Sequence, residues 1–543
     1  MHVLSQEKIY TGVLVIGGGL AGLTAALEAK YNNLSVTIVS KGKTGRSGNS
    51  IIAGAGLSVL VPDSEDSAEL FYNDVIKSGK GINDKQLVKF FVRNSTEEIN
   101  KLSKYGVIFK KINTHLLKKR PPGHSVPRFI HSDYYNVPYM CRGLSITLPL
   151  LSESQKRGIK IVDNTSIIKL LVSPDHRVYG AIGINKKVGK IFIFYANVII
   201  LASGGGGKIF SKSNNMSDIS SDSYSLAYDA GALLRDMEFT QFYPSMMYKP
   251  IRTGIANAIF REGAILRNSL GENFMEKYDK AGNMATRDVM SRAIFTEIVN
   301  GRGINGNVFM DCKSISKNVF EVKYIELYEN LRKKGIDYKK DLLAISPVYH
   351  FFIGGIAINT KAESTLKGLL ACGESVGGLH GANRLTGNAL SEAVVFGIIA
   401  GKSAIKAAKV KNNISYPFDG VEHFRQGKLS NKELKIRLSQ AMWHYASILR
   451  DRNSLEKAKE EIDLISNFME DVRINDISEL LSFYELKSML TTSRLVIEGA
   501  LLRKESRGSH YRLDYPNIDN INFKGNYYFE KVNGRLSIYF KSI

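Results

Sequence analysis

The sequence predicts an α/β protein of several domains, organised around a nucleotide-binding unit. Three observations support this prediction. A short apolar strand near the start of the chain is followed directly by a glycine turn and a helix. A second apolar strand near residue 200 also ends in glycines, and helical periodicity dominates after about residue 430. With 543 residues, the chain is long enough for two or three domains.

The first elements form a βαβ unit. Apolar residues predict a strand over Gly12–Ile16, a helix over Leu23–Lys30 and a second strand over Ser35–Val39. The turn between the first strand and the helix reads Gly-Gly-Gly-Leu-Ala-Gly over residues 17–22, which is a G-x-G-x-x-G pattern. Because the pattern follows a strand and opens a helix, it lies in the context that a dinucleotide-binding motif requires.

Each glycine of this turn has a physical role. Gly17 permits the tight turn, Gly19 lets backbone N–H groups approach a pyrophosphate, and Gly22 lets the helix pack on the strand. The helix N-terminus adds partial positive charge. We therefore expect this turn to bind a dinucleotide through Gly17, Gly19, Leu20, Ala21 and Gly22.

The residues after the second strand indicate which dinucleotide binds. NAD sites commonly place an acid there, whereas this chain has Ser40-Lys41. The next loop, residues 42–56, is rich in small residues and could run along a flat isoalloxazine ring, which favours a flavin. A third strand, expected over Asn197–Ala202, ends in a second glycine loop. Cofactor contacts are expected at Ser40, Lys41, Ser47, Gly48, Ala53, Gly54, Ala55, Gly56, Ser203, Gly204, Gly205 and Asp222.

The rest of the chain divides by texture. A mixed region interrupts the glycine-rich sequence, helical periodicity follows, and the last residues alternate as in a hairpin. We predict a nucleotide-binding domain in two parts, an inserted capping domain, a C-terminal helical domain and a hairpin tail. The nucleotide-binding domain covers residues 1–240 and 351–415, and the capping domain covers residues 241–350 between them. The helical domain covers residues 416–520, and the hairpin tail covers residues 521–543.

Composition narrows the function classes. Cys141, Cys312 and Cys372 lack paired spacing, so we expect no metal site, disulfide framework, iron–sulfur cluster or covalent haem within the chain. Neither a signal peptide nor a membrane span is visible, so the predicted location is cytoplasmic. The net charge of +22 could indicate an anionic partner, but the basic residues are scattered and no nucleic-acid module appears. We expect no nucleic-acid partner.

Three blocks resemble a known family. They are the loop over residues 42–56, the glycine-rich block over residues 373–388 with the sequence His-Gly-Ala-Asn-Arg, and the ending over residues 505–512. The chain resembles the flavoprotein of the fumarate reductase/succinate dehydrogenase family, which also includes L-aspartate oxidase, over nearly its whole length. The resemblance implies an α/β fold with a Rossmann-like FAD-binding domain, an inserted α+β capping domain and a C-terminal helical domain.

The resemblance also places FAD. Glu374 would accept the ribose hydroxyls, and the flavin ring would lie against Asn388, Ala389 and Leu390. Family members with covalent flavin carry a histidine after the Arg-Ser of the first loop. This chain has Gly48 at that position, so its FAD is expected to be non-covalent.

Hydride transfer needs clamps for substrate carboxylates, a proton donor or acceptor, and exclusion of water. Arg384 can grip a carboxylate through two hydrogen bonds, and His350 can donate to another oxygen. The resemblance implies that Arg287, at the start of an amphipathic helix, is the catalytic acid or base. Burial beside a second cation would lower the cost of its transient deprotonation.

Two motifs depart from the family pattern. The usual F-H-P-T appears as Phe-Tyr-Pro-Ser over residues 242–245, so Tyr243 replaces a histidine that touches substrate. The usual T-E-x-x-R-G-E-G appears as Ala-Asn-Ala-Ile-Phe-Arg-Glu-Gly over residues 256–263. With a one-residue deletion, Arg261 keeps the arginine of the family's proton relay and Glu262 is the nearest acid, whereas in the ungapped register Phe260 takes the place of that arginine. We expect proton delivery to Arg287 through Arg261 together with water or Glu262, and a weaker or differently shaped grip at one end of the substrate.

The preferred function is therefore an FAD-dependent oxidoreductase of the fumarate reductase/succinate dehydrogenase flavoprotein type, acting on a small dicarboxylate. Such flavoproteins pass electrons to an iron–sulfur subunit, so we expect a partner of that kind, which could also provide any contact with a membrane. One alternative is L-aspartate oxidase, which converts an amino-dicarboxylate to iminoaspartate. The other is an FAD-binding protein that has lost catalysis.

Overall fold

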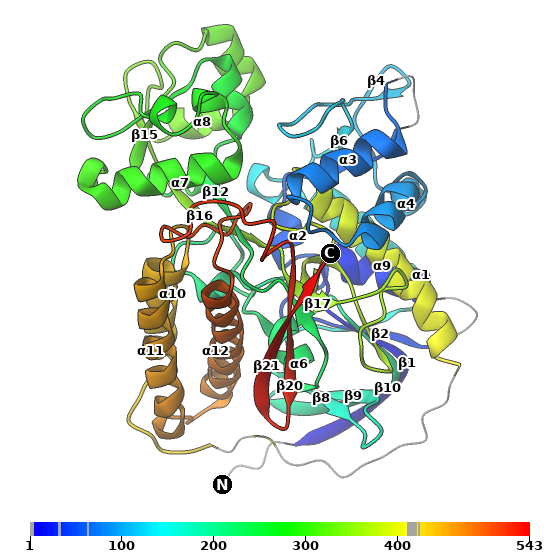
Figure 1. The fold of residues 1–543 in the computed structure, drawn as a ribbon. Helices are drawn as coiled ribbons and strands as arrows, with labels where there is room; N and C mark the ends of the chain where they lie inside the picture. Colours follow the sequence, from blue (N-terminus) through cyan, green and yellow to red (C-terminus); the bar gives the residue numbers. More distant parts are fainter. Residues whose placement is uncertain (1–4, 31–33, 62–64, 410–420, 422–423) are drawn as a thin grey trace.

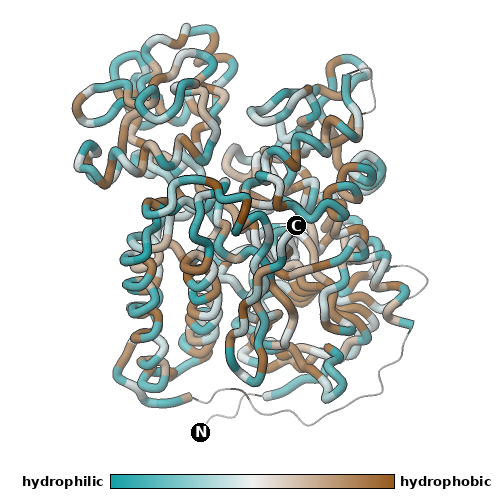
Figure 2. Tube along the Cα trace, viewed as in Figure 1, coloured by the Kyte–Doolittle hydropathy of each residue, from teal (hydrophilic) through white to brown (hydrophobic). Residues whose placement is uncertain are grey.

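The computed structural model describes residues 5–30, 34–61, 65–409, 421 and 424–543 of the chain. Figure 1 shows a body built on sheets, a cap that carries α7 and α8, and a group of long helices, α10, α11 and α12, beside the body. In Figure 2, hydrophobic residues gather along the strands of the body, whereas α11 carries many hydrophilic residues.

The central sheet of the body has seven strands, in the order β7-β2-β1-β10-β9-β8, with β18 also pairing with β10. Strands β7, β2, β1, β10 and β18 pair in parallel, while β9 runs in the opposite direction and pairs antiparallel with both β10 and β8. Their bounds are β1 (Gln6–Ile16), β2 (Val36–Val39), β7 (Lys160–Val162), β8 (Thr165–Val172), β9 (Val178–Asn185), β10 (Lys190–Leu201) and β18 (Leu369–Ala371).

Parallel pairing brings the two glycine loops together. Ile16 pairs with Leu201, so β1 and β10 end at the same edge of the sheet and their loops leave side by side. Strand β1 begins six residues before the predicted Gly12, because its polar first half, from Gln6, pairs with β10. That half is largely exposed, and it therefore lacks the apolar signal on which the prediction rested.

Helices cover this sheet. Helix α1 (Leu20–Ala29) follows the glycine turn directly and packs against α9 (Asn388–Ala407). A Cβ atom at Gly397 would lie 2.2 Å from Thr24 Oγ1, so this close contact requires glycine. Among the described residues, α9 is the only helix long and apolar enough to cross a bilayer, and 67% of that stretch is buried. The other helices of the body are α2 (Asn49–Ile52), α3 (Ala68–Ser78), α4 (Lys85–Lys104), α5 (Leu144–Lys156) and α6 (Asp222–Asp229).

A second sheet joins the end of the chain to the body. Its order is β19-β17-β11-β20-β21, with β11 (Leu234–Arg235), β17 (Gly355–Ala357), β19 (Val376–Gly377), β20 (Gly525–Val532) and β21 (Arg535–Ser542). The expected hairpin is present and turns at Asn533-Gly534, where φ is +49° and +76°. Because β20 pairs with β11, the last residues extend this sheet. Two short pairs, β3 (Gly56–Ser58) with β6 (Phe129–His131) and β4 (Lys111–Ile112) with β5 (His115–Leu116), lie in the body as well.

The cap has its own sheet and its own core. The strand order is β13-β12-β16-β15-β14, with β12 (Thr240–Met247), β13 (Thr253–Gly254), β14 (Ile265–Arg267), β15 (Val308–Asp311) and β16 (Leu343–Phe352). Helices α7 (Arg287–Glu297) and α8 (Ile325–Arg332) pack on it around a cluster that includes Phe274, Met310 and Phe320. The antiparallel strands β12 and β16 connect the cap to the body (Figure 1).

The C-terminal helices are α10 (Asn431–Ala446), α11 (Arg452–Phe468) and α12 (Ile477–Leu502). Leu438, Ile462 and Leu486 from these helices belong to the same buried cluster as Leu14 of the central sheet. Trp443 of α10 packs edge-on against the rings of Phe242 in β12 and Phe295 in α7. The helical domain therefore supports both the body and the connecting strands.

Candidate active site

The glycine turn fits tightly against the end of β10. Gly17 has φ +121°, and a Cβ atom there would lie 2.2 Å from the carbonyl oxygen of Ala202. Gly19 precedes α1 without a side-chain cap, and the first turn of α1 has no acidic residue. Leu20 N–H donates to Ser50 Oγ. The N-terminus of α1 therefore favours an anionic group such as a phosphate.

The first loop is partly open and partly packed. A Cβ atom at Gly54 would meet nothing within 4 Å, and one at Gly48 would meet only Ile219 Cδ1, at 3.8 Å. By contrast, a Cβ atom at Gly56 would lie 2.0 Å from the ring of Phe129. Ala53 is half-buried beside the open Gly54, Ala55 is buried, and Ser47 Oγ donates to the Lys43 carbonyl. The open part, residues 48–54, is where a flat ring could lie.

The structure places Lys41 and Asp222 against each other. Lys41 Nζ lies 3.1 Å from Asp222 Oδ2 and 2.8 Å from Oε1 of Glu485, which belongs to α12. Burial lowers the pKa of Lys41, but the Asp222 and Glu485 carboxylates outweigh it and raise this pKa above its usual range. Ser40 is buried beside Lys41, and its N–H donates to the Val162 carbonyl. These residues form an ion-pair cluster at the end of β2.

The second glycine loop lies against Glu374. A Cβ atom at Gly205 would lie 2.2 Å from Glu374 Oε1, and Gly204, with φ +82°, donates its N–H to Ser375 Oγ. Ser203 Oγ lies 2.5 Å from Ser223 Oγ. The strand-end serine is therefore fixed within the protein, whereas the glycines keep the space beside Glu374 free of side chains.

Two buried polar groups call for a polar ligand. Neither polar atom of the Asn388 amide has a hydrogen-bond partner, although the side chain is fully buried. Glu374 accepts hydrogen bonds from Phe352 N–H and Asn49, and burial raises its pKa to about 7. Hydroxyls of a ribityl or ribose chain and the polar edge of a flavin would satisfy these groups. With half-buried Ala389 and Leu390 beside Asn388, the residues present fit FAD.

Four residues predicted for the substrate side lie together. Arg287 is the first residue of α7, and its guanidinium lies 5.2 Å from the centre of the Tyr243 ring in β12. The Tyr243 ring in turn lies 5.5 Å from the imidazole of His350 in β16. Arg384, in the loop before α9, is close enough to Arg287 and His350 to influence the pKa of His350.

The electrostatics of this group are unusual. Burial lowers the pKa of Arg287, and burial together with the Arg287 charge lowers that of Arg384 to about 9. Burial and both arginines hold the pKa of His350 well below its usual range, so His350 is neutral. Within the described part of the chain, no carboxylate forms an ion pair with either arginine. The group is therefore suited to bind an anion.

The Tyr243 hydroxyl has a hydrogen-bond partner within the protein, and its contact with substrate stays a prediction. The hydroxyl donates to the Ile255 carbonyl at 2.6 Å. The donor is therefore engaged by the cap backbone, and it is the ring of Tyr243 that contacts Arg287. Ala256 and Asn257 come directly after Ile255 in the chain, and Asn257 Oδ1 accepts a hydrogen bond from Ser245 Oγ.

Arg261 is not brought to Arg287 by any described contact. It lies exposed in the cap, and its Nη1 is 3.5 Å from the Arg120 carbonyl oxygen. Glu262 forms an ion pair with Lys323 of the cap. Arg261 is exposed and contacts the body, Glu262 is half-buried and pairs within the cap, and the relay through Arg261 stays a prediction.

Three neighbours of the site were not predicted from the sequence. Gln241 accepts from Arg384, Phe351 lies under the Arg384 guanidinium at 4.5 Å, and the Asn214 amide lies 3.1 Å from His350 Nδ1. Gln241 could have been found, because it lies two residues before Tyr243 on the same strand and therefore on the same face. Asn214 comes from a distant loop, and the sequence carried no signal for it.

The C-terminal block over residues 505–512 packs against two segments that carry site residues. Ser509 N–H donates to the Ala382 carbonyl, and Arg292 of α7 donates to the Gly508 carbonyl at 3.2 Å. Arg507 forms an ion pair with Glu505, and both side chains are buried. This block therefore holds the loop that carries Arg384 and touches the helix that carries Arg287.

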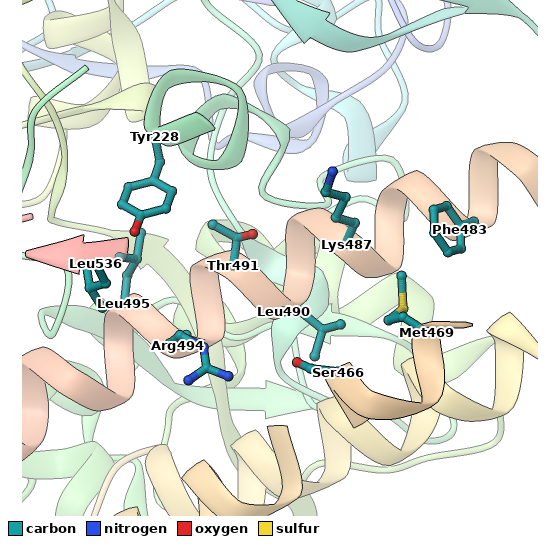
Figure 3. Close-up of a pocket in the computed structure, with 10 residues that line it drawn as sticks. All are labelled: Tyr228, Ser466, Met469, Phe483, Lys487, Leu490, Thr491, Arg494, Leu495 and Leu536. Atoms are coloured by element: carbon teal, nitrogen blue, oxygen red, sulfur yellow. The ribbon is translucent and has the colours of Figure 1, made fainter. Parts of the chain in front are cut away.

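A separate cavity of about 310 Å³ lies away from this site. Figure 3 shows its lining side chains, among them Tyr228 of α6, Leu490 of α12 and Leu536 of β21. None of the predicted site residues lines it. It lies between the helical domain and the body, and we assign it no part in the chemistry.

Comparisons with known proteins agree with these features. The chain matches a family model described as FAD binding domain over residues 12–390, and one described as fumarate reductase flavoprotein C-term over residues 435–541. It is 38% identical to a fumarate reductase (CoM/CoB) chain of Methanothermobacter marburgensis, over 94% of this chain and 96% of that one. It is 33% identical to L-aspartate oxidase of Saccharolobus solfataricus, over 93% and 96%.

A solved structure shows the same fold. The FrdA chain of E. coli quinol fumarate reductase superposes with a TM-score of 0.89 and 25% sequence identity, covering 99% of this chain and 97% of that chain. The family matches confirm FAD as the cofactor and the fold class expected from the sequence. This chain belongs to the fumarate reductase/succinate dehydrogenase flavoprotein family of FAD-dependent oxidoreductases.

Proposed function

We propose that this chain reduces, or forms by oxidation, the carbon–carbon double bond of a small dicarboxylate, with its FAD held non-covalently. The observation that supports this most directly is the group of Arg287, Arg384 and neutral His350. They lie together between the cap and the body, with Arg384 buried and Arg287 and His350 half-buried, and neither arginine has a carboxylate partner in the described part of the chain. A substrate carboxylate is the charge that this group lacks.

Each residue of the group has a distinct role. Arg384 would bind one substrate carboxylate, and His350 would donate a hydrogen bond to an oxygen of the substrate. Bound FAD supplies the hydride in reduction and accepts it in oxidation. Packing of Tyr243 and Phe351 around these polar groups excludes water from the reacting carbons.

Arg287 would complete the reaction. In the direction of reduction, hydride adds to one alkene carbon, and an N–H of Arg287 delivers a proton to the adjacent carbon. The position favours proton loss, because burial lowers the pKa of Arg287 and because a helix N-terminus disfavours a cation. The proton then returns to Arg287 from solvent before the next turnover.

Electrons must come from outside the chain. The three cysteines are separated in sequence, and two of them, Cys312 and Cys372, are buried. They do not provide the set of thiolates that holds an iron–sulfur cluster. We propose that an iron–sulfur partner provides the electron-transfer route, and that the protein is cytoplasmic, with any membrane contact made through that partner.

The direct test is reduction of fumarate by the purified flavoprotein with a reduced viologen dye as the electron donor. Oxidation of the dye is the signal that is measured. Dye oxidation that requires fumarate supports the proposal. Hydrogen peroxide formed with L-aspartate, without fumarate reduction, would instead identify an L-aspartate oxidase. A bound flavin that no candidate substrate reduces or oxidises would show that catalysis has been lost.

A further inference from the structure

Gln241 holds Arg384 in an unusual way. Arg384 Nη2 donates to Gln241 Oε1 at 2.9 Å, and Gln241 Nε2 donates back to the Arg384 carbonyl at 3.0 Å. The same Nε2 donates to Asn383 Oδ1 at 2.9 Å. Gln241 therefore binds both ends of one residue, its side chain and its backbone, and both residues are buried.

The identity of the acceptor has a consequence for charge. Arginine has donors only, so the atom of Gln241 that faces Arg384 must be the amide oxygen. A buried arginine is usually held by a carboxylate, which cancels its charge. Here the amide supplies a hydrogen bond of the same geometry and leaves the guanidinium with no carboxylate of the described residues in contact, with Glu374 and Glu392 acting on its charge only from a distance.

The other contacts of Arg384 are neutral too. Nη1 donates to the Leu385 carbonyl at 3.0 Å, and the Phe351 ring lies 4.5 Å from the guanidinium carbon. The Nε atom is buried and has no hydrogen-bond partner. A donor that is buried without a partner costs free energy unless a ligand fills the position.

The local fold brings these groups to one place. Gln241 pairs with Phe351 across strands β12 and β16, and the register shifts directly after Gln241. The amide and the ring therefore approach the same guanidinium from two neighbouring strands. Both strands lead into the cap (Figure 1), and Gln241 and Phe351 on these strands hold the Arg384 guanidinium.

We propose that Gln241 is a positioning residue that fixes the Arg384 guanidinium through an uncharged acceptor and so reserves its charge for the substrate carboxylate. The inference rests on the proposed role of Arg384 as the carboxylate clamp. It predicts that a negative charge added at position 241 weakens substrate binding more than removal of the hydrogen bond between Gln241 and Arg384 does.

Two substitutions separate these possibilities. Gln241→Glu keeps an acceptor for Arg384 but adds a negative charge, whereas Gln241→Met keeps the length and removes the hydrogen bond. We expect Gln241→Glu to weaken binding about 100-fold and Gln241→Met about 10-fold, because an ion pair with Arg384 competes directly with the substrate. A residue that served only as a scaffold would show the opposite order.

The binding probe is malonate, a dicarboxylate without a reducible double bond, titrated against the FAD-loaded protein and followed by flavin absorbance. Fumarate kinetics provide a second readout, in which Gln241→Glu should raise KM far more than it lowers kcat. Gln155→Glu, the same charge change on the exposed surface of α5, serves as the matched control and should behave like the wild type.

Each outcome is decisive. Malonate binding that is weaker in Gln241→Met than in Gln241→Glu overturns the inference, and so does a wild-type protein that binds no malonate. If the wild type binds malonate but turns over no fumarate, and the variants keep the expected order, the proposed reaction fails while the role of Gln241 stands. If Gln241→Glu does not load FAD, Gln241→Met must still bind malonate about 10-fold more weakly.

Discussion

The cofactor side and the substrate side of this protein are built on different principles. On the cofactor side, backbone makes the site: Gly17 and Gly204 adopt positive φ, and the N-terminus of α1 faces the turn. On the substrate side, side chains make the site, and Tyr243, Arg287, His350 and Arg384 come from four separate segments.

The difference explains which side can change. A backbone site needs glycine wherever a Cβ atom would collide, so its sequence pattern is restricted. A side-chain site needs only that charges and donors meet at one place, so a histidine can become Tyr243 while the surrounding fold is retained. The cofactor of this protein is therefore that of its family, while the grip on its substrate has room to differ.

The largest expected effect is on the substrate side. Arg287→Gln should lower kcat by about 10³-fold without loss of FAD, because it removes the proton donor but leaves the backbone site intact. Dye-linked turnover and flavin content per protein measure the two quantities. Arg332→Gln, on the exposed face of α8, is the control. Loss of FAD in Arg287→Gln would show that the two sides are not independent.

A substitution in the glycine turn should instead reduce the affinity for FAD. Gly17→Ala should weaken FAD binding by about 100-fold, since the added Cβ atom would lie 2.2 Å from the Ala202 carbonyl oxygen and φ is +121°. Titration of the apoprotein with FAD measures this. Gly534→Ala, at the tip of the β20–β21 hairpin, also has positive φ but meets no atom within 4 Å. It should cost stability and leave FAD affinity unchanged; equal losses in both variants would contradict the steric argument.

Glu374 tests a buried acidic side chain on the cofactor side. Burial raises the pKa of Glu374 to about 7 from an ordinary value of 4.5. Between these two pH values, Glu374 is protonated in the folded apoprotein and ionised in the unfolded chain. The protonated Glu374 carboxyl therefore contributes to the stability of the folded state at low pH, and this contribution is lost as the pH rises through about 7. Between pH 5 and pH 7, the unfolding free energy of the apoprotein should fall by about 2 kcal/mol more in the wild type than in Glu374→Gln.

Chemical denaturation of the apoprotein at several pH values measures this difference. Glu97→Gln, which changes an exposed residue of α4, should keep the wild-type slope. If Glu374→Gln and the wild type have parallel pH profiles, Glu374 is ionised throughout and the polar gap that we assign to FAD is filled in some other way.

The smallest expected effect concerns Arg261. Because this residue is exposed and contacts the Arg120 carbonyl, Arg261→Gln should change kcat less than about threefold in the arrangement described here. A loss of tenfold or more would show that Arg261 reaches Arg287 during turnover and that the relay expected from the sequence operates. Fumarate kinetics beside those of Arg287→Gln make the comparison.

The βαβ unit shows what a sequence pattern can predict. Strand β1, the glycine turn and α1 were predictable because neighbours in sequence make the contacts that define them. The polar first half of β1 was missed, since its pairing with β10 is a long-range contact. The hairpin turn at Asn533-Gly534 was predictable for the same local reason, whereas its place beside β11 was not.

The sequence by itself determined the FAD-binding architecture and the identity of the charged residues on the substrate side. Only the tertiary structure decided how those residues are used. It engaged the Tyr243 hydroxyl with Ile255, placed Arg261 on the surface and gave Arg384 an uncharged partner in Gln241. The physical reason is that glycine turns are fixed by local backbone geometry, whereas the charge and pKa of a buried side chain depend on neighbours that are distant in sequence.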